Sequence, residues 1–126
     1  MYRRDEAKLL KSNYKIWKNE KIKNGNGFFP IWNEFKKFLS TSKLSGGALR
    51  LYIFFGIVSK NETGESWYSV KRLAEELECS ERSIQEWSKE LSDVGLIKRF
   101  QIKFNSTSFT YLLPYYNETN TKDKKS

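Results

Sequence analysis

The fold is decided by Ser69–Leu113, SVKRLAEELECSERSIQEWSKELSDVGLIKRFQIKFNSTSFTYLL, within a chain of 126 residues. Ser69 is of a type that caps helix N-termini, and apolar residues follow it at helical spacing: Leu73, Ala74 and Leu77. We therefore predict a short helix with one buried stripe immediately after Ser69.

A second short helix is expected after a tight turn at Cys79. Ser80 is its expected N-cap, and Gly95 can end it in the left-handed conformation that glycine adopts readily. Its expected buried stripe has helical spacing and consists of Ile84, Trp87 or Ser88, and Leu91. Two short helices joined by so tight a turn predict a helix-turn-helix.

The segment after Gly95 predicts a β-hairpin, called a wing when it follows a helix-turn-helix. Along residues 97–104, apolar Phe100, Ile102 and Phe104 alternate with polar Arg99, Gln101 and Lys103. After the turn cluster 105–108, the apolar positions are Phe109, Tyr111 and Leu113. We expect the apolar side to be half-buried and the basic side to lie against a phosphate backbone. An ordinary solvated hairpin is the alternative.

Three further segments precede the helix-turn-helix. Residues 28–39 predict a short core-packing helix with Pro30 in its first turn and one apolar face, made of Trp32, Phe35, Phe38 and Leu39. Residues 44–59 are apolar on most faces and predict the central buried helix, with Ser45 as its N-cap. Ser66–Ser69 has high β propensity and predicts a short strand that pairs with the wing.

The predicted fold class is therefore α+β. We expect a winged helix-turn-helix, mostly helical, with a small antiparallel β-sheet (wing hairpin plus short strand) and an extra N-terminal helix. The expected parts are a basic N-terminal helix at residues 1–27, the winged helix-turn-helix domain at 28–114 and a mobile basic tail at 115–126.

The N-terminal segment carries much of the positive charge. Residues 1–23 hold eight basic and three acidic residues, a net charge of +5 in a chain whose formal net charge is +8. Apolar residues lie among them at helical spacing: Leu9, Leu10, Tyr14 and Trp17. Four roles fit this helix: docking on the domain, pairing with a second subunit, contacting phosphates, or lying on a membrane surface. The overall charge favours a polyanionic partner, and a Lys-rich composition without function is the plain alternative.

The composition excludes several classes of protein. With one cysteine and no histidine, the chain has no disulfide scaffold, zinc finger, Ser-His-Asp triad or Cys-His pair. The longest apolar run, Leu51–Val58, is too short to cross a bilayer, and the N-terminus lacks an apolar signal core. We expect a cytoplasmic protein that is not an enzyme, with a reduced thiol, no metal and no cofactor.

The winged helix-turn-helix pattern of bacterial DNA-binding proteins resembles three pieces of this sequence: Ser80-x-Arg82-Ser83-Ile84, Leu91, and Gly95-Leu96-Ile97-x-Arg99. More widely, residues 28–116 look like the winged-helix proteins of Gram-positive plasmids and mobile elements, including the N-terminal domains of plasmid replication initiators. This resemblance implies that the second helix is a recognition helix that enters the major groove of DNA.

The resemblance also implies roles for single residues. Arg82 can reach guanine, Gln85 can read adenine, and Ser83 or Lys89 can take a phosphate or a base edge. For Arg82, an ion pair with Glu86 one turn later is the alternative. The full set of expected DNA contacts is Lys71, Arg72, Arg82, Ser83, Gln85, Lys89, Lys98, Arg99, Lys103, Asn105 and Ser106.

The charge of the helix pair departs from the family pattern. Residues 71–93 hold four basic and seven acidic residues, a net charge of −3, which suits phosphate binding poorly. We therefore expect the wing and the N-terminal helix to supply most of the affinity for DNA.

Three functions follow from these features. The first is binding of double-stranded DNA, as a homodimer or in tandem, by an accessory or regulatory protein of replication, conjugative transfer or transcription that can also meet other replication or transfer proteins. The second is a protein-interaction winged helix. The third is a platform for single strands, built from the wing with Tyr115 and Tyr116. None of the three needs a membrane.

Overall fold

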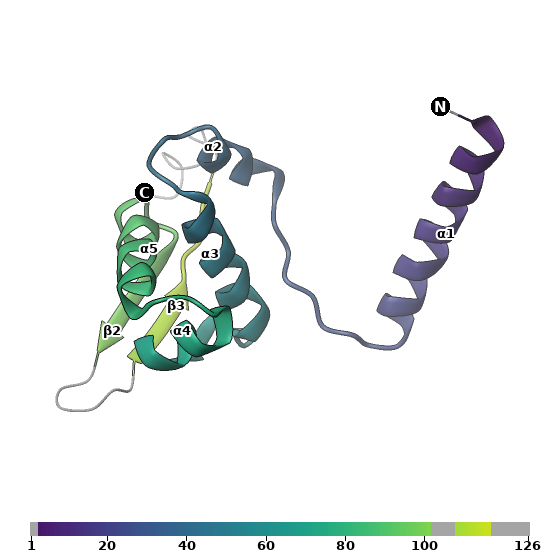
Figure 1. Ribbon diagram of the computed structural model, residues 1–126. Coiled ribbons are helices and arrows are strands. Elements are labelled where there is room, and N and C mark those ends of the chain that lie inside the picture. The colour runs from purple at the N-terminus through teal and green to yellow at the C-terminus, as the bar shows by residue number, and fades with distance from the viewer. Residues whose placement is uncertain (1–2, 102–107, 117–126) are drawn as a thin grey trace, which may run out of the picture.

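The computed structural model describes residues 3–101 and 108–116 (Figure 1). Its elements are α1 (Arg4–Lys23), the 3₁₀ turn η1 (Asn33–Phe35), α2 (Lys36–Leu39), α3 (Gly46–Val58), β1 (Glu65–Trp67), α4 (Val70–Leu77), α5 (Glu81–Asp93), β2 (Ile97–Gln101) and β3 (Ser108–Leu112). The predicted fold class is confirmed: this is an α+β winged helix-turn-helix with a three-stranded antiparallel sheet.

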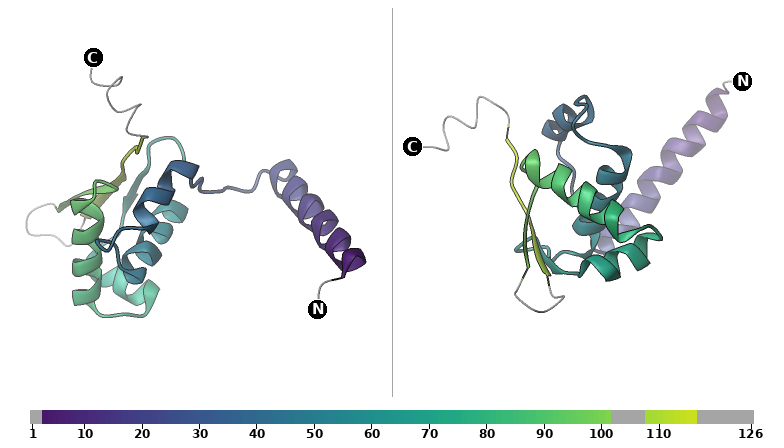
Figure 2. Two further views of the ribbon diagram at one scale, coloured as in Figure 1. Left: turned by 90° about the horizontal axis from the view of Figure 1, so that it is seen from above. Right: turned by 60° about the vertical axis from the view of Figure 1, so that its left-hand side comes forward.

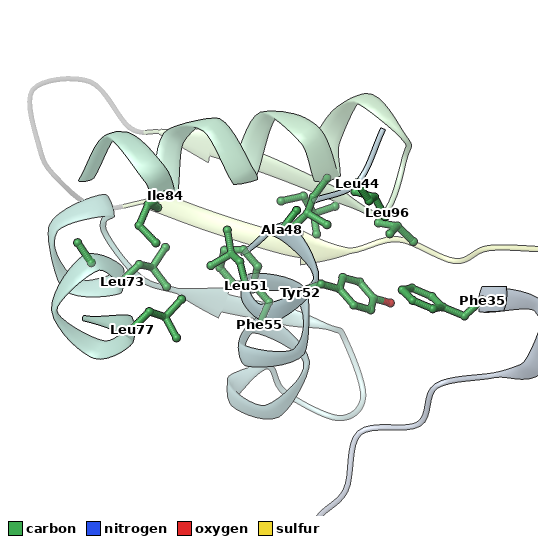
Figure 3. Packing of buried hydrophobic residues seen from close by; sticks show 13 residues of the cluster. Phe35, Leu44, Ala48, Leu51, Tyr52, Phe55, Leu73, Leu77, Ile84 and Leu96 are labelled. Carbon is green, nitrogen blue, oxygen red and sulfur yellow. The ribbon is translucent and has the colours of Figure 1, made fainter. Parts of the chain in front are cut away.

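Helix α3 forms the centre of the core, as predicted. Ser45 caps it, since its Oγ accepts a hydrogen bond of 3.1 Å from the Ala48 N–H. One face of α3 is buried, whereas Ile53 and Ile57 on other faces are 45% and 68% exposed, so the helix is less enclosed than its apolar sequence predicts. The hydrophobic core that α3 forms with the other elements (Figure 3) consists of Phe35, Leu44, Ala48, Leu51, Tyr52, Phe55, Leu73, Ala74, Leu77, Ile84, Leu91, Leu96 and Ile97.

The two helices of the motif begin at the predicted caps. Ser69 Oγ accepts from the Arg72 N–H at 3.1 Å, and Ser80 Oγ accepts from the Ser83 N–H at 3.0 Å. Between them the chain turns at Glu78, whose φ of 53° lies in the left-handed region without the glycine that usually serves there. Gly95, with φ of 83°, follows α5 as predicted.

Trp87, rather than Ser88, fills the space between α5 and α3. A Cβ placed on Gly47 of α3 would lie 2.0 Å from Trp87 Cε2, so the indole packs directly on the backbone of α3. Ser88 turns partly inward and its buried hydroxyl has no hydrogen-bond partner among the described residues. Gly47 thus lets the motif approach the central helix closely.

Gly47→Ala is expected to lower the free energy of unfolding by about 2 kcal/mol, because the new methyl collides with a large, rigid ring. Alanine's higher helix propensity, worth about 1 kcal/mol, offsets only part of this cost. Urea unfolding measures the change. Gly46→Ala is the matched control, since a Cβ there meets no atom within 4 Å and the variant should not be destabilised. Equal stability of the two variants would contradict this packing.

The sheet has the strand order β1-β3-β2, with all pairs antiparallel. Its registers place Trp67 opposite Phe109 and Phe109 opposite Phe100. The predicted short strand therefore exists and pairs with the wing as expected, although it occupies Glu65–Trp67 rather than Ser66–Ser69. Helices α3, α4 and α5 all lie on one side of this sheet (Figure 2, right).

The alternation predicted for the hairpin is present, but the side assigned to the core is wrong. Ile97 is buried and Arg99 points the same way, whereas Lys98 and Phe100 are exposed on the other side. In β3 the buried residues are Ser108 and Thr110, whereas Phe109, Tyr111 and, just after the strand, Leu113 are only partly buried. Side chains two residues apart on a strand share a face. Because Ile97 is buried, Arg99 lies on the packed face of the sheet and Phe100 on the open face. The predicted positions Ile102, Lys103 and Phe104 lie outside the described residues.

The segment between α1 and α3 also differs from its prediction. Helical structure begins at Asn33, so Pro30 precedes it instead of lying in a first turn. Phe35 is buried, but Trp32 and Leu39 are 62% and 60% exposed, so these residues do not share a buried face. A 3₁₀ turn followed by one turn of α-helix does not keep the 3.6-residue period that the prediction assumed.

Tyr115 lies in the domain, although we expected the tail to begin there. Its ring packs edge-on against Phe35 and Phe38 at centroid distances of 5.5 and 5.8 Å. Its hydroxyl accepts a hydrogen bond of 2.9 Å from the Trp32 N–H, which ties β3 to the segment before α2. The remainder of the predicted tail, residues 117–126, lies outside the described residues.

Helix α1 stands apart from the domain and is joined to it by residues 24–32 (Figures 1 and 2). It ends at Lys23, and Gly25 follows with φ of 72° in the left-handed region. No side chain of α1 is buried, so of its four predicted roles the docking on its own domain is wrong. Its exposed large apolar residues are Leu9, Leu10, Tyr14, Ile16, Trp17 and Ile22.

Candidate nucleic-acid interface

Helix α5 packs on the core through Ile84 and Leu91 and turns its other side to solvent. Arg82, which the sequence marks as a base-reading residue, is exposed and forms an ion pair of 3.2 Å with Glu86. Lys89 forms a similar pair of 2.9 Å with Asp93. Both are exposed pairs one helical turn apart, which contribute at most about 0.5 kcal/mol each, so a stronger anion can displace the carboxylates.

The other expected contacts on the helix pair differ in availability. Gln85 is exposed between Arg82 and Lys89. Ser83 is half-buried, and its hydroxyl is hydrogen-bonded at 3.0 Å to the hydroxyl of the N-cap Ser80. Its side chain is therefore less available to a ligand than those of Arg82 and Gln85. On α4, Lys71 and Arg72 are both exposed, and the Arg72 guanidinium lies 4.7 Å above the Tyr68 ring.

The hairpin contributes one exposed cation of the predicted set. Lys98 is exposed, with its Nζ 5.6 Å from the centroid of the Phe100 ring. Arg99, expected on the same basic face, instead points inward: it donates hydrogen bonds to Thr110 Oγ1 and, at 2.8 Å, to the Tyr68 carbonyl. Burial lowers its pKa to about 10, which still leaves it charged at neutral pH. Lys103, Asn105 and Ser106 lie outside the described residues.

The N-terminal half of α5, helix α4 and the paired ends of β2 and β3 lie at one end of the domain. Figure 3 shows Ile84, Leu73 and Leu77 at this end of the core, with Leu96 and Phe35 toward the opposite end. The ends of β2 and β3 that are joined by the hairpin turn lie at the same end (Figure 1), and Gln101 pairs there with Ser108. The structure thus brings the start of α5, helix α4 and the base of the hairpin to the same end of the domain.

Charge on the helix pair is mixed. Exposed acidic residues of α4 and α5 accompany the cations, and they are Glu75, Glu76, Glu78, Glu81, Glu86 and Asp93. Glu90 is different, since its carboxylate accepts hydrogen bonds of 2.7 and 3.1 Å from the Ser45 N–H and Oγ and so joins α5 to the start of α3. The sequence contains no pattern that marks this structural role.

Helix α1 carries a stripe of cations along one face. Arg4, Lys8, Lys11, Lys15 and Lys18 follow at alternating spacings of four and three residues, which keeps them on one side of a helix, and all are exposed. We call these five residues the basic stripe. It extends over about 20 Å at 1.5 Å per residue, enough to meet several successive phosphates of a duplex.

Features of other classes of site are scarce in the part of the chain that the structure describes. Within residues 3–101 and 108–116, no group of three or more His, Cys, Asp or Glu side chains is placed to hold a metal ion. In the same ranges, no helix combines the length and apolar character that a membrane span needs.

Comparison with known proteins agrees with this fold. A family described as a helix-turn-helix domain matches residues 42–97. A chain in the solved structure described as "Structure of Rep-DNA complex" is 17% identical, with a TM-score of 0.52, over 83% of this chain and 89% of that one. A chain described as "N-Terminal domain of DNA binding protein" is 19% identical, with a TM-score of 0.46, over 83% and 88%. No curated protein matches this chain in sequence. Together, the matched segment and the first of these structures assign residues 42–97 to a helix-turn-helix fold.

Proposed function

We propose that this protein binds double-stranded DNA through its winged helix-turn-helix domain. The observation that carries the proposal is the capped helix pair α4–α5, whose second helix is anchored by Ile84 and Leu91 and presents Arg82 and Gln85 to solvent. The match to a helix-turn-helix family and the fold shared with a chain from a Rep–DNA complex support it.

In the proposed complex, the N-terminal half of α5 lies in the major groove. Arg82 leaves Glu86 for a guanine edge, and Gln85 pairs with adenine. Lys71 and Arg72 of α4 and Lys89 of α5 are exposed and contact flanking phosphates. The geometry supports this docking because the exposed ion pairs that hold the cations of α5 are weak.

Affinity comes mainly from outside the helix pair. Glu86 and the other acidic side chains repel phosphates, so the cations that compensate must lie elsewhere. The basic stripe of α1 and Lys98 of the hairpin are exposed and carry no acidic partner among the described contacts. We propose that these groups, with Lys103, Asn105 and Ser106 of the wing, supply most of the phosphate contacts.

The proposed biological role is that of an accessory or regulatory protein of a plasmid or mobile element, in replication, conjugative transfer or transcription control. The resemblance of residues 28–116 to winged-helix proteins of such elements supports it. We propose binding as a homodimer or in tandem on repeated sites, one helical turn or a multiple of it apart. Footprinting on DNA upstream of the gene, combined with sedimentation of the complex, tests both statements.

The decisive experiment for duplex binding uses a site selected by the protein from a random duplex library and read by fluorescence anisotropy. Arg82→Ala should weaken binding about tenfold or more, the effect of one lost bidentate base contact. Glu86→Gln should tighten it severalfold, because it frees Arg82 and removes a negative charge from the interface.

Glu62→Gln is the matched control for Glu86→Gln. It removes the same charge from an exposed position in the turn after α3, next to Gly64, whose carbonyl accepts from Leu112 at the far end of β3. Its binding should equal that of the wild type. Failure to select any duplex, or identical binding by the Arg82 and Glu86 variants, would overturn the proposal.

A further inference from the structure

The outer face of the sheet carries four aromatic side chains. Trp67, Phe109 and Phe100 form one row across all three strands, and Tyr111 lies in the next outward-facing row between Glu65 and Lys98. We call Trp67, Phe100, Phe109 and Tyr111 the aromatic sheet face. It is the face that sequence reasoning assigned to the core.

These rings are open to solvent to different degrees. Trp67 is 40% and Phe100 is 48% exposed, and Phe109 and Tyr111 are each partly buried. Trp67 meets Phe109 edge-on at 5.9 Å, and Phe100 meets Tyr111 edge-on at 6.0 Å. Edge-on packing does not stack the rings face to face, so ring faces that are not covered by a partner remain as flat apolar surface for a ligand.

Within the described part of the chain, no helix lies over this face. The sheet uses its other side for the core, where Ser66, Thr110 and Ile97 are buried beneath the helices (Figure 2, right). A sheet with one packed side commonly turns polar residues to solvent on the other. Four rings in that position are therefore surplus to the needs of folding.

Two cations border the rings. Lys60 Nζ lies 5.0 Å from the centroid of Trp67, and Lys98 Nζ lies 5.6 Å from that of Phe100. Across the sheet, the rows that hold the rings contain one acidic residue, Glu65. Flat rings flanked by ammonium groups match a ligand that presents flat bases and phosphates together.

We propose that the aromatic sheet face binds single-stranded DNA, with bases stacked on Trp67 and Phe100 and phosphates held by Lys60 and Lys98. Neighbouring strands lie about 4.8 Å apart, so the row of three rings is wide enough for two or three bases. Stacking on a base is stronger than an exposed cation–π contact, so each ammonium leaves its ring for a phosphate as the base arrives.

Single-stranded DNA is favoured over a protein partner by charge. A protein interface core is depleted of charged residues, whereas this face has an ammonium at each end of its aromatic row. DNA is favoured over RNA because the same domain carries the proposed duplex-binding helix. The single-strand site uses none of the residues of that helix and shares only Lys98 with the proposed duplex contacts, so substitution of the rings tests it separately from the duplex site.

The test titrates the full chain into fluorescein-labelled dT15 and follows anisotropy. Trp67→Leu/Phe100→Leu keeps apolar side chains on the strands but removes both rings, and should weaken dT15 binding about tenfold or more. Binding of the selected duplex should change less than about twofold, since neither ring belongs to the duplex interface. Phe28→Leu, which removes a 72% exposed ring outside the sheet, is the matched control and should bind dT15 as the wild type does.

Lys60→Gln/Lys98→Gln tests the phosphate contacts separately. Its plot of log K against log salt concentration for dT15 should be shallower by about 1.4, or about 0.7 for each lost single-strand contact. Circular dichroism and thermal unfolding establish that each variant is folded.

Three results would overturn the inference. The first is equal dT15 affinity for the wild type and a folded Trp67→Leu/Phe100→Leu variant. The second is binding of rU15 as tight as that of dT15, which would remove the assignment to DNA. The third is a change of sedimentation from dimer to monomer in the double variant without loss of dT15 binding, which would make this face a contact between two copies of the chain. Loss of duplex binding alone would instead contradict the proposed function.

Discussion

Replacing Lys8, Lys11, Lys15 and Lys18 together by glutamine is expected to weaken duplex binding about a hundredfold at 0.1 M salt. All four lie on the basic stripe of α1, fully outside the folded core, so the change should act on phosphate contacts and not on folding. Each lost contact lowers the slope of log K against log salt concentration by about 0.9, so the slope should become shallower by about 3.6 if all four engage. Anisotropy titrations at several salt concentrations measure both effects.

The matched control replaces the same four residues by arginine, which keeps the charge and a similar helix propensity. It should bind duplex DNA as the wild type does. Glutamine also keeps the helix propensity close to that of lysine, and circular dichroism should show equal helix content in both variants. An unchanged salt slope in the glutamine variant would contradict phosphate binding by α1. Pairing with a second subunit and lying on a membrane surface would then be its remaining predicted roles.

Arg99→Met is expected to lower the free energy of unfolding by about 2–3 kcal/mol, while its direct effect on DNA binding stays small. The guanidinium satisfies Thr110 and the Tyr68 carbonyl beneath the sheet, and its loss leaves both without that charged donor. Its Cζ also lies 5.8 Å from the centroid of Phe55, in the core. Urea unfolding measures the loss, and duplex titration at a temperature where the variant is folded measures binding.

Lys98→Met is the matched control, one residue earlier on the same strand. The Lys98 side chain is exposed and, among the described contacts, makes no hydrogen bond or ion pair, so its replacement should leave stability within about 0.5 kcal/mol. Duplex binding should fall instead. The reverse outcome, a stable Arg99→Met that binds DNA poorly, would show that the basic face predicted from the sequence is the correct one.

Local sequence determined the helices of the motif and their order. Ser45, Ser69 and Ser80 cap α3, α4 and α5, and the apolar spacing inside each helix selects the side that faces the core. These signals are short-range: a cap bonds to an N–H three residues on, and a helical stripe repeats every three or four residues. The fold class and the solvent-exposed side of α5 could therefore be predicted without tertiary information.

Which face of the β2–β3 hairpin packs on the core could not be predicted from the sequence. Its alternation is compatible with either face inward, since both sets of side chains contain groups that can pack. The helices decide it by burying Leu96 and Ile97 at the entry to β2, after which every second residue follows Ile97 inward. Arg99 then lies under the sheet with two buried acceptors, and the large rings move to the outside.

The same distinction explains the remaining differences. The sequence leaves Trp87 and Ser88 as alternative core residues of α5. The structure selects Trp87, because Gly47 on α3, 40 positions earlier in the chain, leaves room for the indole. The sequence predicts a tail that begins at Tyr115. The contacts of Tyr115 with Phe35 and Phe38 place it in the domain instead, and these contacts join residues far apart in the chain.

Sequence alone thus determined where the helices of the motif begin and end, because caps and periodicity act over a few residues. Tertiary structure decided which side of the sheet is packed, which cation is structural, and where the aromatic sheet face lies. These outcomes depend on contacts between residues far apart in the chain, so they cannot be predicted from any one segment of the sequence.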